Sequence, residues 1–190
     1  MRLFRFLSPS PSQDVAALLY GHAVAQARDP DFYAAGGVPD TLDGRFDMVC
    51  LHVFLLLHRL KRDGTAGGEL GQRLFDRMFA DLEMNMRELG VSDYGIGHRM
   101  KAMAAAFYGR IAAYEEGLAA GDAGLRPALA RNLFGTAPAG EAQLAAIADY
   151  VRREAAGLDR QDAAALLAGE VAFGPAPVFQ PAASAKSIEA

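Results

Sequence analysis

A chain of 190 residues has room for one domain and can bury a sizeable core without a metal or a disulfide. Its residues are 52% hydrophobic and 22% charged, which excludes a disordered or fibrous protein. The formal net charge of −4 argues against a dedicated nucleic-acid binder, and the single cysteine, Cys50, excludes an internal disulfide.

The N-terminal segment 1–12 is predicted to precede the folded domain. Residues 1–7 mix two arginines with two phenylalanines, and the serines and prolines of 8–12 are typical of a linker. Two interpretations of residues 1–7 remain: they pack on the domain or stay disordered, or they touch a membrane surface. The start is too short for a signal peptide, and no run in the chain is long enough to span a bilayer.

The region 13–172 is predicted to form one helical domain. Apolar residues recur at helical spacing over 13–28, 42–62, 74–89, 98–118, 125–133, 141–154 and 159–167. Asp40 or Thr41 is a candidate N-cap of the second helix, and the glycine-rich residues 64–71 and the turn-rich residues 91–97 are expected to be loops. The Pro- and Ala-rich residues 173–190 are expected to form a disordered tail.

The expected fold class is all-α, because no run of residues alternates between polar and apolar side chains. Helix 42–62 is apolar almost all round. A helix of this kind is buried, so we expect an irregular bundle of about six to seven helices around 42–62.

The residues whose side chains could take part in catalysis or bind a ligand do not form a recognisable catalytic, cofactor-binding or metal-binding set. Gly95 and Gly97 begin like a dinucleotide fingerprint, but a third glycine and a preceding strand are missing. His52 is predicted to be a core histidine with satisfied hydrogen bonds, and Cys50 lies in an apolar helix without an obvious polarising partner. No catalytic residue, metal or cofactor is therefore assigned.

Small residues form a track on the helix predicted at 98–118. Gly109, Ala113 and Gly117 are spaced four apart, on the side opposite the apolar stripe. Such tracks let another helix approach closely. The track is explained either by tight packing inside the bundle or by a groove that receives an apolar helix of a partner.

Three blocks of residues add a more specific pattern. The first is Tyr114-Glu-Glu-Gly-Leu118, Asp122, Leu125, Ala128-Leu129 and Arg131-Asn-Leu-Phe134. The second is Val38-Pro-Asp-Thr41, Leu51-His-Val-Phe54 and Arg59-Leu60, and the third is Phe75 through Asp81, Arg87 and Leu89-Gly90. Together the blocks, which span roughly 20–134, resemble the ubiquinol–cytochrome c chaperone family. The C-terminal third contains no block that aligns.

The resemblance implies a non-catalytic assembly chaperone that binds newly made cytochrome b and supports assembly of the respiratory bc1 complex. Mitochondrial members often carry tryptophan where this chain has Phe54, Phe79 or Ala130, and Glu115 stands where the family has aspartate. With the Ala-, Arg- and Gly-rich composition, these departures indicate a bacterial member. Its expected location is the cytoplasm, or the periphery of the inner membrane.

Eight residues are candidate partner-binding residues. Three are the small residues Gly109, Ala113 and Gly117, and five are polar: Glu115, Glu116, Asp122, Arg131 and Asn132. The polar five are candidates for the rim of a groove or for contacts with client loops. The alternative is that they fix the turn between two helices through charge-assisted hydrogen bonds.

Two other functions remain open from the sequence. A helical lipid- or quinone-binding protein at the membrane surface would have an apolar cavity. An enzyme would need polar residues converging in a pocket, for instance around His52 and Asp47.

Overall fold

The computed structural model describes residues 11–179, with side chains from Val15 onward. The elements in chain order are α1 (Pro11–Ala27), α2 (Asp31–Ala34), α3 (Leu42–Leu60), the 3-10 helix η1 (Lys61–Asp63), α4 (Gly64–Glu88), α5 (Asp93–Ala120), α6 (Asp122–Asn132), α7 (Glu141–Asp159) and α8 (Ala163–Leu167). No strand occurs among the described residues, and the all-α fold class is confirmed. Residues 1–10 and 180–190 lie outside the described range, and so does the membrane contact predicted for residues 1–7.

Helix α3 is the centre of the bundle, as its composition predicted. It packs against α1, α4, α5 and α7, and its side chains from Cys50 to Leu56 are all buried. Thr41, one of the two candidate caps, begins the helix by accepting a hydrogen bond from the Gly44 N–H at 3.1 Å. Gly44 is required because a Cβ there would lie 2.0 Å from the Pro39 carbonyl oxygen.

The C-terminal end of α3 is tied to α7 by a buried arginine. Arg59 is 5% exposed and donates to the carbonyl oxygen of Leu158 at 3.0 Å and to the carboxylate of Asp63 at 2.7 Å. A buried guanidinium needs several acceptors, and the carbonyls at the end of a helix have free lone pairs. Arg59 therefore joins two helix ends that are far apart in the chain.

The prediction of a loop over 64–71 is wrong, because these residues form the first turns of α4. Glycine lowers helix propensity, but it permits close packing. A Cβ at Gly67 would lie 2.1 Å from the Leu60 carbonyl oxygen, and a Cβ at Gly71 would lie 3.2 Å from Leu57. Packing against the end of α3 thus decides the local structure.

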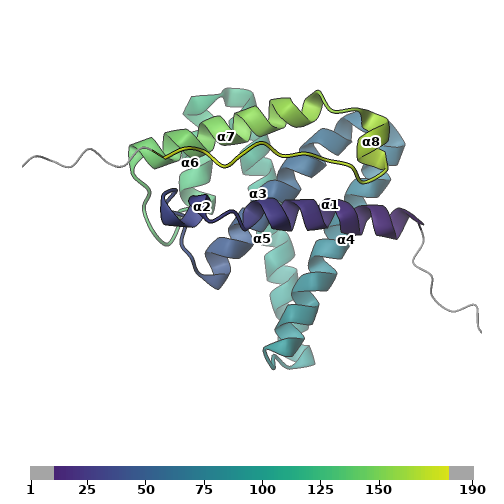
Figure 1. Ribbon diagram of the computed structural model, residues 1–190. Coiled ribbons are helices and arrows are strands. Elements are labelled where there is room, and N and C mark those ends of the chain that lie inside the picture. Colours follow the sequence, from purple (N-terminus) through teal and green to yellow (C-terminus); the bar gives the residue numbers. More distant parts are fainter. Residues whose placement is uncertain (1–10, 180–190) are drawn as a thin grey trace, which may run out of the picture.

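The turn-rich segment predicted over 91–97 is also mostly helical. Ser92 caps α5 by accepting from the Gly95 N–H at 3.3 Å, and Ile96 is 4% exposed. With α4 starting earlier and α5 starting earlier than predicted, these helices reach 25 and 28 residues. Their joined ends, residues 80–105, project from the bundle as a helical hairpin, which we call the arm and which lies below the body in Figure 1.

The C-terminal part of the chain returns across the bundle. Helix α7 extends to Asp159, and Asp162 rather than Asp159 caps α8. Residues 168–179, the strap, then run back between α1 and α7 (Figure 1). The sequence placed the start of a tail at 173, yet Ala176 is 8% exposed and Gly174 is hydrogen-bonded to α7. Packing therefore continues at least to Phe179.

Candidate interaction surface

One face of α5 is exposed and lined by small side chains. Its exposed members are Ala102, Ala105, Ala106, Gly109 and Ala112, with half-buried Ala113 beside them. A Cβ placed on Gly109 would have no described atom within 4 Å. The half of the track around Gly109 is therefore open among the residues that the structure describes. We call this surface, residues 102–113, the open face of α5.

The other half of the track is used inside the fold. Gly117 is buried, and a Cβ there would lie 2.9 Å from the Cα atom of Leu125 in α6. Gly124 of α6 faces it, because a Cβ on Gly124 would lie 3.2 Å from the Gly117 Cα atom. The packing explanation therefore applies at Gly117, where α6 packs, and the groove for a partner's helix stays a prediction at Gly109, which no described atom approaches.

Glu115 is held by two side chains at the end of α3, those of His58 and Lys61. Its carboxylate lies 2.9 Å from His58 Nδ1 and 2.5 Å from Lys61 Nζ. Partial burial raises the pKa of Glu115, but the hydrogen bonds from Lys61 and His58 outweigh burial and hold that pKa below its ordinary value. These contacts fix α5 to α3 next to the open face.

Of the remaining polar candidates, Glu116 and Asp122 flank the α5–α6 turn, whereas Arg131 and Asn132 lie at the far end of α6. Asp122 pairs with Arg126 at 3.1 Å and also with Arg152 of α7. Asn132 donates to the Ala128 carbonyl at 2.9 Å, whereas Arg131 and Glu116 are exposed. Asp122 and Asn132 therefore have contacts within the helices, and the role of the eight candidates in partner binding stays a prediction.

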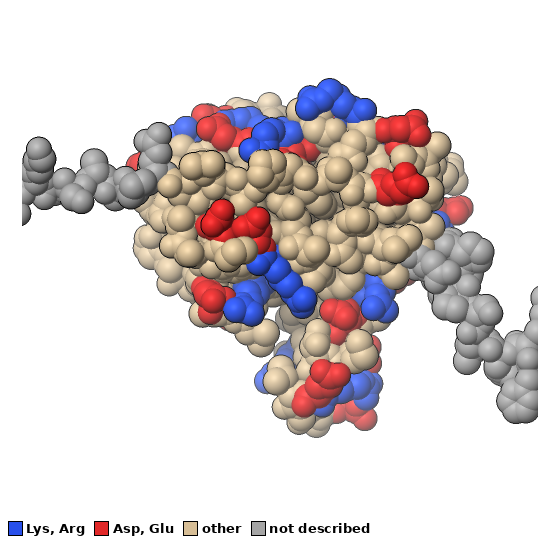
Figure 2. Space-filling model, in the orientation of Figure 1, with Lys and Arg blue, Asp and Glu red and all other residues tan. Residues whose placement is uncertain are grey.

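The arm carries large apolar side chains that the sequence did not single out as surface residues. Leu89 is 68% exposed and Tyr94 is 92% exposed at its tip, although Leu89 fits the apolar stripe of α4. The arm carries charged side chains of both signs (Figure 2), and Arg87 pairs with Glu83 and Asp93 at 2.7 Å each. Correct prediction of the helix lengths would have revealed the arm, because α4 and α5, with 25 and 28 residues, are longer than the central helix α3, with 19.

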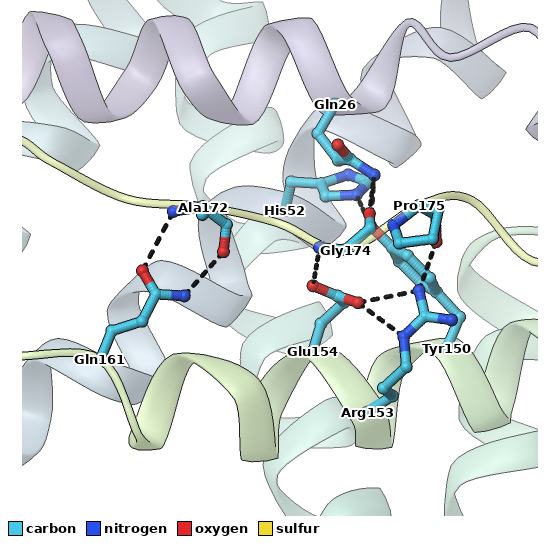
Figure 3. A network of polar contacts seen from close by, with 9 residues as sticks. All are labelled: Gln26, His52, Tyr150, Arg153, Glu154, Gln161, Ala172, Gly174 and Pro175. Atoms are coloured by element: carbon cyan, nitrogen blue, oxygen red, sulfur yellow. Dashed lines mark hydrogen bonds and ion pairs between the residues drawn. The ribbon is translucent and has the colours of Figure 1, made fainter.

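His52 is a core histidine with both ring nitrogens bonded, as predicted. Its Nδ1 lies 2.8 Å from the Met48 carbonyl, which only accepts, so Nδ1 carries the proton. Its Nε2 accepts from the Tyr150 hydroxyl at 2.7 Å, and the Gln26 amide donates to that hydroxyl oxygen at 3.1 Å (Figure 3). Burial lowers the pKa of His52 to about 4, although the bond to Met48 raises it.

Asp47 and His52, the residues considered for a catalytic pocket, have different bonding partners. Asp47 pairs with Arg110 of α5 at 2.6 Å, and the bonding partners of His52 are Met48 and Tyr150. Cys50 is fully buried, and burial raises the pKa of its thiol. Asp47 and His52 therefore belong to separate polar contacts, and Cys50 is a buried thiol.

Hollows on the described surface are open to solvent. One of about 420 Å³ is lined by Tyr33, Asp40 and Arg45, and one of about 200 Å³ lies between Val15 and Leu70. No helix among residues 11–179 combines the length and apolar character needed to cross a membrane. Within the same residues, no three His, Cys, Asp or Glu side chains gather as a metal site would require.

These features define an all-helical protein with an exposed small-residue face and a projecting arm. A comparison with protein families matches residues 34–173 to the family described as ubiquinol-cytochrome C chaperone. The match reaches past 134 into the C-terminal third, where the sequence motifs could not be aligned. The chain belongs to this family.

Named relatives agree with this assignment. Ubiquinol-cytochrome c reductase complex assembly factor 1 of Mus musculus is 32% identical over 85% of this chain, and its counterpart from Xenopus laevis is 32% identical over the same share. The chain spans 55% of the mouse protein and 82% of the Xenopus protein. The crystal structure of the Cbp3 homolog from Brucella abortus, at 36% identity, matches with a TM-score of 0.78 and covers 87% of this chain and 92% of that one. A bacterial relative with this fold is consistent with the predicted bacterial member.

Proposed function

We propose that this protein is a non-catalytic chaperone that binds newly made cytochrome b and supports assembly of the respiratory bc1 complex. Family membership supports this function, and the names of the mouse and Xenopus relatives refer to assembly of ubiquinol–cytochrome c reductase. None of the relatives named above is described as a lipid- or quinone-binding protein, and no structural observation favours that alternative.

The observation that carries the proposal is the open face of α5. Small side chains let an incoming helix approach closely, so that many weak dispersion contacts form. Tyr108 is 56% exposed beside this face and adds apolar area. Cytochrome b is rich in transmembrane helices, and an apolar helix exposed to water is stabilised when a complementary surface covers it.

The polar candidates then form the border of this contact. Glu116 and Arg131 are exposed and therefore free to meet client loops or polar ends of client helices. The open face lacks large buried anchors, which dominate tight interfaces. Affinity is therefore expected to be modest, which suits a chaperone that must release its client.

Working beside an integral membrane client places the protein in the cytoplasm or at the periphery of the inner membrane. Residues 1–7 are the candidate for direct membrane contact. Recovery of the protein with membranes, compared between the full chain and a chain lacking residues 1–12, tests that contact. Equal recovery of both would reject it.

Site-specific photo-cross-linking tests the client and the surface together. A photoreactive residue replaces Ala105 or Ala112 on the open face, or Ala25 on α1, which is also exposed, as a matched control. During synthesis of cytochrome b, we expect adducts with the new polypeptide from positions 105 and 112 but not from position 25.

Two outcomes separate the parts of the proposal. Adducts from Ala25 but not from Ala105 would place the client elsewhere and reject the surface. The absence of cytochrome b adducts from every position, together with normal bc1 levels in cells lacking the protein, would reject the function.

A further inference from the structure

The strap is bound mainly through its backbone, by side chains of other segments (Figure 3). The Gln161 amide group accepts from the Ala172 N–H at 3.0 Å and donates to the Ala172 carbonyl at 2.6 Å. Gly174 donates its N–H to Glu154 at 2.7 Å and accepts from Gln26 at 2.9 Å. Such paired contacts to peptide groups are how binding sites hold an extended peptide.

The carboxylate that receives the strap is built into the groove between α1 and α7. The Glu154 side chain is 4% exposed, and Arg153 donates to it at 2.9 Å. Arg153 also donates to the Pro175 carbonyl oxygen. A buried carboxylate is costly without hydrogen-bond donors, so the groove needs an N–H at the position that Gly174 fills.

The side chains of the strap fit this groove in a specific order. The Phe173 ring lies edge-on to His52, with 5.3 Å between ring centroids, and Ala176 and Pro177 are buried. A Cβ on Gly174 would lie 2.7 Å from the Glu154 carboxylate. The groove therefore selects an aromatic residue followed by glycine and a proline-containing extended segment.

The strap can leave the groove without unwinding a helix. Among the described residues, its last backbone–backbone hydrogen bond joins the Glu170 N–H to the Ala165 carbonyl, at the end of α8. Beyond Glu170 its hydrogen bonds run to side chains. Segments that lie outside the helices can open locally at a lower free energy than the helices of the core, and the strap is such a segment.

From these contacts we propose that the groove between α1 and α7 is a peptide-binding site, which the strap fills in cis. Its partner in trans is an extended polypeptide segment with an aromatic residue followed by glycine and proline. Binding of that segment displaces the strap. The segment then contacts Phe32, His52 and Tyr150, whose rings form the floor of the groove. The face that surrounds the strap is largely uncharged (Figure 2), which suits such a segment.

Competition between strap and partner makes the site self-inhibited. A tethered segment has an effective concentration on the order of millimolar at its own site. The apparent affinity for a peptide in trans is reduced by the fraction of molecules with an empty groove. Weakening the strap without altering the groove should therefore increase the apparent affinity.

The test uses a fluorescent peptide of residues 169–179 and the full chain. Gly174→Ala weakens the strap by the clash with Glu154, whereas Val178→Ala, at a position 92% exposed, is the matched control. We expect the Gly174→Ala protein to bind the peptide about tenfold or more tightly than the wild type, and the control to match the wild type. A peptide with the same Gly-to-Ala change should bind neither protein.

Equal peptide affinity of the Gly174→Ala and wild-type proteins, or equal binding of the altered peptide, would overturn the proposal. Hydrogen exchange on the wild type gives an answer even if the variant folds poorly. The amides of Ala172 and Gly174 should exchange through local opening, faster than the amides in the middle of α3. Exchange of both sets only through global unfolding would make the strap a fixed part of the core and reject a displaceable strap.

Discussion

Gly109 and Gly117 lie about two turns apart on one helix but have opposite surroundings. The first faces open space, and the second lies against the α6 backbone. Replacing each glycine with alanine therefore tests, through the change in stability, whether a neighbouring helix lies against that position.

Replacing each glycine with alanine should change stability in opposite directions. Gly109→Ala should raise the free energy of unfolding by about 0.5–1 kcal/mol, because alanine favours the helix and meets no neighbour. Gly117→Ala should lower it by about 1 kcal/mol or more, because the clash with Leu125 exceeds the gain in helix propensity. Urea unfolding of both proteins measures the two effects. Stabilisation by both substitutions would contradict the close packing of α6 on α5.

His52 makes stability depend on pH. Its pKa is about 4 in the folded protein against 6.5 in the unfolded chain, so the unfolded chain binds more protons between these values. Stability should thus be complete above pH 6.5 and fall as the pH decreases toward 4, by at most on the order of 3 kcal/mol. Protonation at Nε2 would also remove the acceptor of the Tyr150 hydroxyl, because the Nε2–H group and the hydroxyl would then both be donors.

A comparison with His52→Gln isolates this contribution. Asp47, whose pKa burial raises to about 6, contributes an opposite slope, but it is present in both proteins and cancels in their difference. Denaturant titrations from pH 7 to about 4 should show a steeper loss in the wild type than in His52→Gln. His22→Gln, at an exposed position, should keep the wild-type slope. Parallel curves for the wild type and His52→Gln would refute the assignment.

At the scale of elements, the arm depends on an aromatic cluster at its base. Phe107 of α5 is fully buried, with its ring centroid 5.7 Å from that of Phe75 and 6.2 Å from that of Phe79, both in α4. Toward the tip most side chains are exposed. The base thus provides most of the burial that keeps the two helices paired.

Phe107→Ala should loosen the arm more than the body. The loss of a buried ring is expected to cost about 3–5 kcal/mol. The exchange rates of amides over 80–105 should increase more than those of amides in α7. Helix α7 is the reference because the aromatic contacts of Phe107 are with α4. Hydrogen exchange with mass spectrometry measures both regions. Tyr108→Ala, at a half-exposed ring of the same cluster, is the control and should have a smaller effect. Uniform acceleration in both proteins would show that arm and body open together.

Helices α3 and α4 show why prediction succeeds for some elements and fails for others. Helix α3 was found because its apolar residues continue around the whole helix, a pattern that only burial explains. The start of α4 was missed because Gly64, Gly67 and Gly68 disfavour a helix locally. The contacts of Gly67 with Leu60 stabilise the helix there, and they become visible only when the chain is folded.

At the scale of the whole molecule, one core joins all the helices. Buried side chains from α1 through α7 belong to a single cluster, and Leu167 of α8 packs against it. The strap adds Ala176 to it and continues over the groove between α1 and α7. The body therefore offers a fixed frame, on which the open face of α5, the arm and the strap remain available for contacts.

The candidate site shows the same limit. The small-residue track and the polar cluster near 115–132 were visible as spacing and motif in the sequence. Sequence could not distinguish the covered end at Gly117 from the open end at Gly109, because coverage depends on where α6 packs. Tyr150 and Glu154 are neighbours on α7, but Gln26 lies more than 120 residues away, so no spacing rule brought it to them around the strap.

The amino-acid sequence by itself determined the helical class, the central position of α3 and the family. These follow from residue periodicity and motifs, which are local properties of the chain. Tertiary structure alone decided which half of the α5 track is exposed, that α4 and α5 project as an arm, and that the strap fills a groove. Each of those depends on contacts between residues far apart in sequence, and local patterns do not encode which partner covers a given face.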